Sequence, residues 1–315
     1  MTVNLKSRQQ GVALITAVLI VALVTAAAVA MASKQQFDIR RTANIFNNDI
    51  AYQFALGAED YARNVLEWDI TKAGSTTDHL GEDWAQDVAV PVEGAMLTGS
   101  VQDLQGRINL NSLLDGNGAP NVEMVKRFKH LLDLLGLNQD ISQAVLDWID
   151  VDINPSFNGG AEDDYYMLQT PPYRAANRLM VSVSELLLVM GVDDEVYQLL
   201  LPHVSALPVV STKINVNTAS AEVLASLAVT MTIADGEALI QARPDTGFAK
   251  IADFTAQTLL SNHPAYKEYF LDVQSDYFLA DAMAEFDEST AQVHSLLKRY
   301  SDGRVQVVMR SRGAY

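Results

Sequence analysis

The chain has 315 residues, of which 49% are hydrophobic, and a formal net charge of −17 at pH 7. This length and apolar content suffice for two domains with a sizeable core. Cysteine is absent, which excludes disulfides, thiol catalysis and cysteine-based zinc sites. The acidity argues against a nucleic-acid partner, because phosphate binding needs clustered Lys and Arg, and it suits the binding of hard cations.

The first predicted element is an apolar helix near the start of the chain. From Val12 to Ala32 only Thr16 and Thr25 interrupt a run of aliphatic residues and Met. A helix over residues 12–32 covers about 31 Å, the thickness of a bilayer core, whereas the apolar region of an export signal has about 7 to 15 residues. The segment is therefore long enough to span a membrane. Cleavage after an Ala-x-Ala sequence, as in an ordinary export signal, is the alternative.

The helical pattern continues beyond the length that a membrane requires. No glycine occurs between Gly11 and Gly57, and no proline occurs before Pro91. Apolar residues recur at about the spacing of one helical face, at Phe37, Ile45, Tyr52, Ala55, Ala58, Ala62, Val65 and Leu66. We therefore expect one helix from Val12 to about Asp69, about 87 Å long, with its first half in lipid and its second half against a soluble domain.

Strand patterns bracket a helical block in the rest of the chain. Alternation over 96–110 predicts a strand and a turn, and a second alternating region follows residue 275, with Ser301-Asp302-Gly303 as a hairpin turn. Short apolar segments ended by Gly, Asn or Pro predict helices from 113 to about 270. The expected fold class is α+β, in which a long N-terminal helix packs on a small antiparallel sheet and an all-helical domain is inserted in the sheet.

Two stretches of the helical block resemble each other. Residues 107–118 and 213–224 each pair an I-N-[LV]-N strand with a hydroxyl residue placed to cap the following helix. The expected cap is Ser112 in the first stretch and Thr218 or Ser220 in the second. The pattern predicts a repeated passage from strand to helix.

Motifs for DNA binding and catalysis are missing. Residues 214–254 resemble the helix-hairpin-helix modules of competence and repair proteins, but the glycine pair and the lysine that contact phosphate there are absent. We find no phosphate-binding loop, dinucleotide fingerprint, zinc-protease motif or nucleophile elbow. A non-enzymatic protein without a nucleic-acid partner is expected. The alternatives are a DNA-binding component of an uptake pilus and a membrane-anchored hydrolase whose site the sequence does not reveal.

An acidic stretch is the candidate metal site. Six carboxylates lie within 18 residues, at Asp147, Asp150, Asp152, Glu162, Asp163 and Asp164. Asp150-x-Asp152-x-Asn154 copies the start of an EF-hand loop, but Pro155 stands where the sharp-turn glycine belongs. Oxygen ligands in an acidic loop with two glycines favour calcium, and a solvated acidic loop is the alternative.

Long motifs spread along the chain resemble minor pseudopilin K of the type II secretion system, the general secretion pathway protein K family. The resemblance rests on VALITAVLI after Gly11, DLQGRINLNSL, LDWIDVD, GAEDDYYMLQTPPYRAANRLMVSVSELLLVMGV, LPHVSALP and INVNTAS. It covers nearly the whole chain.

The resemblance implies that the chain is made as a prepilin. Residues 1–11 would be the leader, which a prepilin peptidase removes between Gly11 and Val12 before Val12 is N-methylated. Residues 12–32 would then cross the bacterial inner membrane once, with the soluble domains in the periplasm. Most pilin-like proteins have a glutamate as the fifth mature residue, which neutralises the amino terminus of a neighbouring subunit. Thr16 stands at this position, so we expect a subunit at the end of the filament.

The resemblance also implies a domain organisation. A type IV pilin-like α/β domain would comprise residues 33–112 and 273–315. A helical domain of the SAM-like or helix-hairpin-helix-like type would occupy residues 113–272. Its division into 113–207 and 213–272 is left open.

The implied function is that of a non-enzymatic subunit of the secretion pseudopilus. The family is thought to cap the tip, to start assembly with minor pseudopilins I and J, and to contact exported proteins or the outer-membrane secretin. Calcium in the helical domain is expected by similarity. Asp150, Asp152, Glu162 and Asp163 are the residues chosen as its ligands.

Overall fold

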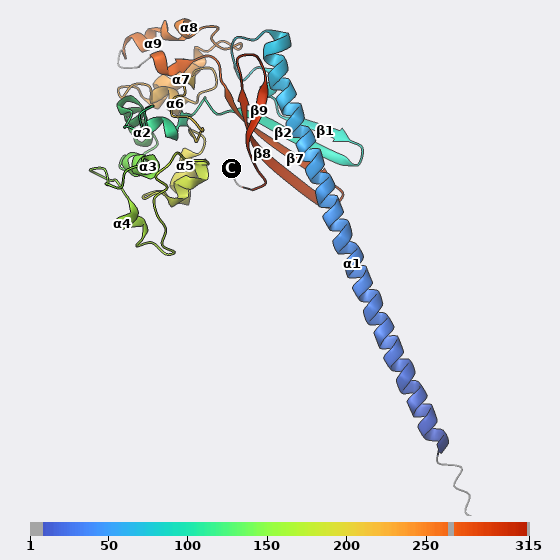
Figure 1. The fold of residues 1–315 in the computed structure, drawn as a ribbon. Helices are drawn as coiled ribbons and strands as arrows, with labels where there is room; N and C mark the ends of the chain where they lie inside the picture. Colours follow the sequence, from blue (N-terminus) through green and yellow to red (C-terminus); the bar gives the residue numbers. More distant parts are fainter. Residues whose placement is uncertain (1–8, 264–267, 314–315) are drawn as a thin grey trace, which may run out of the picture.

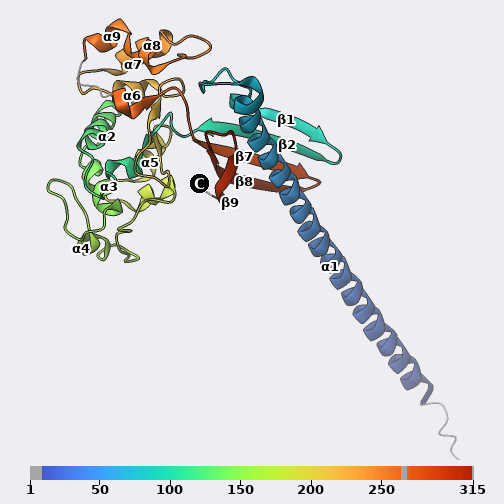
Figure 2. The same cartoon turned by 45° about the horizontal axis from the view of Figure 1, so that its top comes forward.

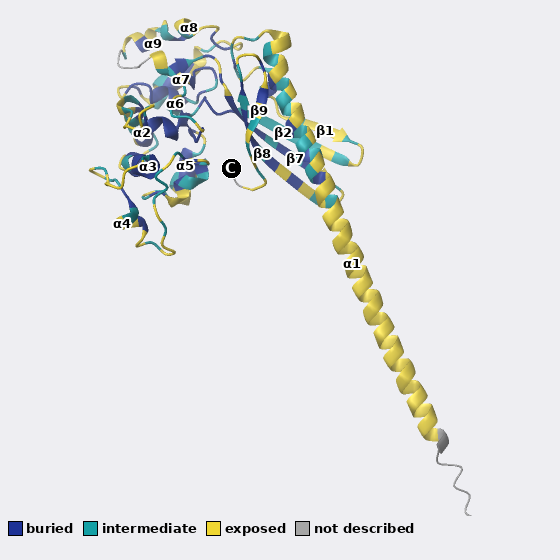
Figure 3. Ribbon diagram, in the orientation of Figure 1, coloured by how far each residue is buried: buried dark blue, intermediate teal, exposed yellow. Residues whose placement is uncertain are grey.

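The computed structural model describes residues 9–263 and 268–313 (Figure 1). Its first element is α1 (Gln9–Trp68), which confirms the predicted long helix. A turn of π-helix (Asp69–Ala73) follows, and Gly74 ends it in the left-handed conformation, with a φ of 68°. The first half of α1 projects from the body with its side chains exposed, and the second half packs on a sheet (Figure 3).

The main sheet has five antiparallel strands in the order β1-β2-β7-β8-β9. The strands are β1 (Val88–Val92), β2 (Ala95–Asp103), β7 (Tyr277–Phe286), β8 (Ser289–Arg299) and β9 (Val305–Ser311). The predicted turn at Ser301-Asp302-Gly303 lies between β8 and β9, and Gly303 has a φ of 86°. β1 was not expected from the sequence; it has five residues, is interrupted by Pro91 and is mostly exposed.

α1 lies chiefly on β7 and β8. Ala51, Ala55 and Leu66 of α1 are fully buried against the sheet, and small residues such as Ala284 allow the helix to approach it closely. Glu59 is buried at the same interface, where its carboxylate accepts hydrogen bonds from Arg310. α1 is thereby fixed to the sheet along its second half only.

The chain between β2 and β7 forms a separate, mostly helical region beside the sheet (Figures 1 and 2). Its helices are α2 (Val122–Leu134), α3 (Ile141–Ile149), α4 (Asp163–Tyr166), α5 (Asp194–Leu200), α6 (Ala221–Ala225), α7 (Ile233–Gln241), α8 (Ile251–Thr255) and α9 (Thr258–Ser261). Short 3-10 helices include Leu110–Leu113 and Val183–Leu188. The domain limits at residues 113 and 272 stay predictions.

Two short parallel strand pairs show that this region contains a repeat. β3 (Ile108–Asn109) pairs with β4 (Val204–Ser205), and β5 (Ile214–Asn215) pairs with β6 (Leu271–Asp272). β3 was expected in the pilin-like part, but its strand partner β4 belongs to the helical region. Each repeat thus opens with an Ile-Asn strand that pairs with a strand near the end of the same repeat.

The second asparagine of each I-N-[LV]-N stretch clamps a distant backbone segment. The side-chain amide of Asn111 accepts from Met180 N at 2.8 Å and donates to Met180 O at 2.9 Å. Asn217 does the same to Phe248, with distances of 2.7 Å to N and 3.1 Å to O. Both asparagines are fully buried, so each clamp satisfies backbone groups that water does not reach.

We expect Asn217→Ala to lower the free energy of unfolding by about 2 kcal/mol or more, because Phe248 N and O lose their partners while still buried. Chemical denaturation measures this value. Asn64→Ala, at an exposed position of α1, is the control and should change it by less than about 0.5 kcal/mol. Equal values for the two variants would contradict the clamp.

The helix caps agree with the sequence in part. Ser220 caps α6, since its hydroxyl accepts from Val223 N at 3.3 Å. The expected cap at Ser112 is wrong, because Ser112 lies inside the 3-10 helix Leu110–Leu113 and Asn121 caps α2. Thr218 donates its hydroxyl to Asp103 instead of capping a helix.

Candidate functional site

The residues expected for processing and anchoring lie in the projecting part of α1. Gly11, Val12 and the following apolar side chains are exposed. Within the described ranges, α1 is the one helix long and apolar enough to cross a membrane. The Thr16 hydroxyl donates to Ala13 O at 3.0 Å, so the helix itself satisfies this polar group. Residues 1–8 of the expected leader lie outside the described residues.

The acidic loop after α3 brings together three of the four carboxylates that were predicted as calcium ligands. Asp150, Asp152 and Glu162 each place an oxygen within 4.8 Å of the others. Asp150 directly follows the last turn of α3, and Glu162 precedes α4, so the loop between the two helices folds back on itself.

Two glycines permit this close return, as the sequence indicated. A Cβ atom at Gly160 would lie 2.3 Å from Oδ2 of Asp147 and 2.4 Å from Ser156 N. Gly159 has a φ of 102°, and a Cβ there would lie 2.3 Å from the Cβ of Asp140. Any larger residue would push the loop away from Asp147 if it replaced Gly160, and away from Asp140 if it replaced Gly159.

Five buried oxygens of this loop and its surroundings have no hydrogen-bond partner among the described residues. They are Oδ1 of Asp147, Oδ1 of Asp150, both carboxylate oxygens of Glu162 and Oδ1 of Asn177. Glu162 is only 3% exposed. Unpartnered buried carboxylates are costly, and the atoms gathered here are all acceptors, so they would be satisfied by a cation and not by one another.

In the absence of a cation, the negative charges of the loop repel one another. Burial, with Asp147 and Asp150 next in effect, raises the pKa of Glu162 to about 7. Burial, with Asp152 and Asp147 next in effect, raises the pKa of Asp150 to about 6. The folded loop therefore favours either protons or a positive ion at these carboxylates.

Asp163, the fourth predicted calcium ligand, makes other contacts. Asp163 accepts from Ala175 N at 3.0 Å and forms a 3.7 Å ion pair with Arg174. Asp147, from α3, and Asn177, 15 residues after Glu162, supply unpartnered oxygens that the predicted ligand set did not include. Asn177 has a φ of 45°, and its side-chain nitrogen donates to Asp152 O, which aims the amide at the loop.

This set of donors fits calcium. Carboxylate and amide oxygens are the ligands that calcium takes in proteins, usually six to eight of them, with water completing the shell. Asp147, Asp150, Asp152, Glu162 and Asn177 would hold the ion. The ion would supply charge neutralisation and cross-link α3, the loop and the segment around Asn177.

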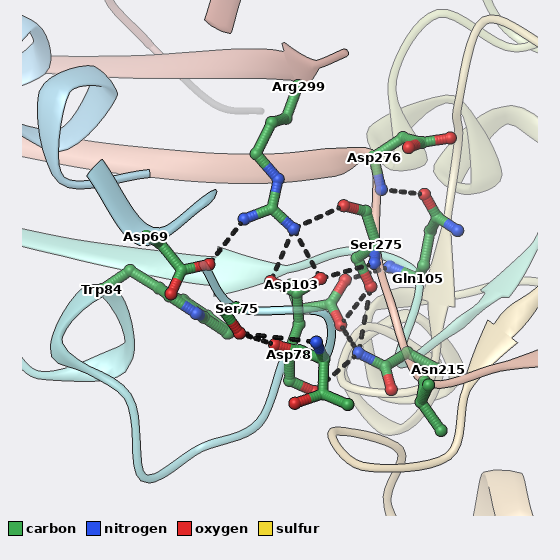
Figure 4. A network of polar contacts seen from close by, with 12 residues as sticks. Asp69, Ser75, Asp78, Trp84, Asp103, Gln105, Asn215, Ser275, Asp276 and Arg299 are labelled. Atoms are coloured by element: carbon green, nitrogen blue, oxygen red, sulfur yellow. Dashed lines mark hydrogen bonds and ion pairs between the residues drawn. The ribbon is translucent and has the colours of Figure 1, made fainter. Parts of the chain in front are cut away.

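A second acidic group lies at the junction between the sheet and the helical region. Asp69, Asp78 and Glu82 also approach one another within 4.8 Å. Arg299, 3% exposed, donates to both oxygens of Asp78 and to Asp69 at 3.0 Å (Figure 4). Glu82 accepts from Trp84 Nε1 at 2.6 Å and from His79 N at 3.0 Å. These carboxylates are satisfied by the chain, which distinguishes them from the loop at Glu162.

Asp103 joins the two parts of the molecule at this junction. This residue ends β2, and its carboxylate accepts from Asn215 Nδ2 at 2.9 Å and from Ser275 Oγ at 2.7 Å (Figure 4). Ser275 N donates to Asp78 at 2.7 Å, so the Asp103 and Arg299 contacts form one network. The network ties both connections of the helical region to the end of the sheet.

Known proteins match this chain over almost its whole length. The family described as "Type II secretion system (T2SS), protein K" matches residues 106–209 and 214–274, the two repeats of the helical region. A protein of Pseudomonas aeruginosa named "Type II secretion system protein K" is 38% identical, over 97% of this chain and 93% of that protein. One of the same name from Pectobacterium carotovorum is 35% identical, over 99% and 98%.

A solved structure shares the fold. It is the crystal structure of "the GspK-GspI-GspJ complex from enterotoxigenic Escherichia coli Type 2 Secretion System", of which one chain superposes with a TM-score of 0.78 at 27% identity. The match covers 87% of this chain and 100% of the other.

Proposed function

The chain belongs to the type II secretion system protein K family, and on this premise we propose that it caps the tip of the secretion pseudopilus and starts its assembly. The family membership itself supports a role as a minor pseudopilin. The name of the solved complex supports pseudopilins I and J as partners. We propose further contacts with exported proteins and with the outer-membrane secretin.

The observation that carries the proposal is the shape of the molecule. The apolar first part of α1 is free of the body, as a membrane anchor or a packing helix requires, while the second part holds the sheet (Figure 1). The helical region stands beside the sheet and widens the head. A subunit with so wide a head would collide with its neighbours in a tightly wound helical array, but it has room at the end.

We propose that processing follows the pilin pattern. A prepilin peptidase would cut between Gly11 and Val12, both of which lie on the exposed, unpacked part of α1. Val12 would then be N-methylated, and Thr16 would be the fifth mature residue. Its hydroxyl already bonds to Ala13 O and needs no charged partner, which suits a subunit with no amino terminus to neutralise.

Immunogold labelling of overproduced pseudopili tests the position. Label for this protein should be confined to one end of each filament, and Thr16→Glu should leave it there, because the bulk of the head still keeps the protein off the shaft. Gly11→Glu should retain the leader, as mass spectrometry of the membrane protein would show, and give filaments without label. Label spaced along the shaft of wild-type filaments would refute the tip position.

We also propose that the loop at Glu162 binds calcium in the periplasm. The support is the set of unpartnered buried oxygens from Asp147, Asp150, Glu162 and Asn177. The ion would then fix the part of the helical region around α3 and α4 (Figure 1).

A further inference from the structure

α1 leaves part of the sheet uncovered. The helix lies chiefly on β7 and β8, while β1 and the adjoining part of β2 lie to one side of it (Figure 2). A groove of about 1000 Å³ runs there between α1 and the β1–β2 hairpin. Its floor is formed by apolar side chains of the two strands, Val88, Val90, Leu97 and Val101.

The helix wall of the groove is also apolar. Tyr61 and Trp68 of α1 line the groove and are 51% and 47% exposed, and Val90 on the floor is 43% exposed. The described part of the chain therefore leaves large apolar side chains in contact with water on both sides of one groove. Such a concave apolar surface is typical of a site that a partner covers.

Two glycines face this groove without an internal reason. Gly57 lies inside α1, where glycine is less favourable than alanine, yet a Cβ atom there would meet nothing within 4 Å. Gly99 lies inside β2, and a Cβ there would be 3.4 Å from Asp281 O, an ordinary contact. The fold of this chain would accept alanine at either position. Glycine at such positions is explained when another backbone approaches closely.

The charges around the groove are predominantly acidic. Four carboxylates line it, Asp69, Glu82, Asp83 and Asp281, against one amine, that of Lys72. Lys72 lies over the Trp68 ring, 4.5 Å from its centre. Asp83 is exposed and forms no ion pair with the residues that the structure describes. An occupant with a basic side chain near Asp83 would complement this charge.

We propose that the groove receives an amphipathic helix of a partner minor pseudopilin, with small and apolar residues toward Gly57 and Gly99 and a basic residue toward Asp83. A helix with its side chains is about 10–12 Å across and neighbouring strands lie about 4.8 Å apart, so one helix would cover two strands such as β1 and β2. Helices also pack side by side at about 8–10 Å, a distance that small residues such as Gly57 permit. This inference rests on the proposed function, and the groove is the surface through which the chain would bind its partner.

Photo-crosslinking in the full-length chain tests the occupant. Because the sequence has no cysteine, Val90→Cys creates a single thiol on the groove floor, which a benzophenone maleimide can label in membranes that also contain pseudopilins I and J. Antibodies against I and J should then detect an adduct with one of them. Val122→Cys, 61% exposed on α2, is the matched control and should give none.

The substitution Gly57→Leu distinguishes an effect on partner binding from an effect on folding. Gly57→Leu should raise the melting temperature of the free chain or leave it unchanged, since leucine favours a helix, but should lower the recovery of I and J with the full-length chain by about tenfold or more. Gly116→Leu is the control, because a Cβ at Gly116 also meets nothing within 4 Å, and it should leave both quantities unchanged.

Different outcomes would refute the groove as the partner site and the proposed function itself. Normal recovery of I and J with Gly57→Leu, or an adduct at Val90→Cys with a second copy of this chain, would overturn the groove as the partner site. If the wild-type chain recovered neither I nor J, the proposed function itself would fail.

Discussion

Calcium is expected to raise the melting temperature of this protein by about 5–10 °C at a hundredfold excess over its dissociation constant. Binding to the native state alone adds about 2.7 kcal/mol under these conditions, and each kcal/mol shifts a domain of this size by about 2–4 °C. The physical reason is that the ion would satisfy buried oxygens of Asp147, Asp150 and Glu162 that the chain leaves unpartnered. Differential scanning calorimetry with calcium and with chelator measures the shift.

Glu162→Gln separates the ion site from general effects of calcium. The shift should be lost or strongly reduced in this variant, because both oxygens of Glu162 are buried without a hydrogen-bond partner. Asp164→Asn, an exposed carboxylate beside the cluster, is the control and should keep the shift. An unchanged melting temperature on chelation would leave the loop as a solvated acidic surface.

The pH dependence of this effect has a definite sign. The pKa of Glu162 rises from 4.5 to about 7 in the folded chain, so without calcium the unfolded state loses its proton first as the pH increases. Stability from this group is therefore present below about pH 4.5 and is lost as the pH rises to about 7. In chelator, Glu162→Gln should be more stable than wild type at pH 8 and equal to it near pH 4.5. With calcium at pH 8 the order should reverse.

Arg299→Met is expected to destabilise the protein by about 3–5 kcal/mol, the usual cost of breaking a buried ion pair from one side. Arg299 is 3% exposed and donates to both oxygens of Asp78, to Asp69 and, at 3.0 Å, to Ser275 O. Methionine keeps much of the volume over the Phe278 ring but leaves the carboxylates without their cation. Urea denaturation at pH 8 measures the loss.

Two further variants define the origin of the loss. Asp78→Asn in the Arg299→Met background should recover part of the stability, because it removes a buried charge. Arg304→Met, which breaks the exposed pair with Asp302, should leave the stability almost unchanged. Burial raises the pKa of Asp78 to about 7 even with Arg299 in place, so this carboxyl takes up a proton near pH 5 and the loss should be smaller there. A loss in Arg299→Met no larger than that in Arg304→Met would show that the junction does not depend on this cation.

Local patterns predicted the elements that depend on local sequence. α1 was predicted because no proline and, after Gly11, only Gly57 interrupt it, and the β8–β9 turn because Gly303 closes a Ser-Asp-Gly sequence and readily adopts the positive φ found there. β1 was missed because Pro91 within a short, exposed strand weakens the alternating pattern. Ser112 was assigned as a cap because the sequence does not distinguish a 3-10 helix from the start of an α-helix.

The candidate site was predictable only where its residues are neighbours in the sequence. Asp150, Asp152 and Glu162 fall within one acidic stretch, whereas Asn177 reaches the loop only through the fold. The junction network joins Asp78, Asp103 and Arg299 from three distant segments. A single sequence contains no spacing that relates such residues, and so the network was not foreseen.

The place where the helical region leaves the sheet has a consequence for folding. Asp103 and Phe278 are directly paired in β2 and β7, so the whole region occupies the position of a hairpin turn. Joining these two residues through an unfolded chain of this length costs about 4–5 kcal/mol by the (3/2)RT ln n relation, apart from a constant. If the helical region forms first, its ends are already held together by the Asp103 to Ser275 contact. Most of the loop-closure entropy is then lost when the inserted region folds. The helices would form first, and β2 and β7 would pair afterwards.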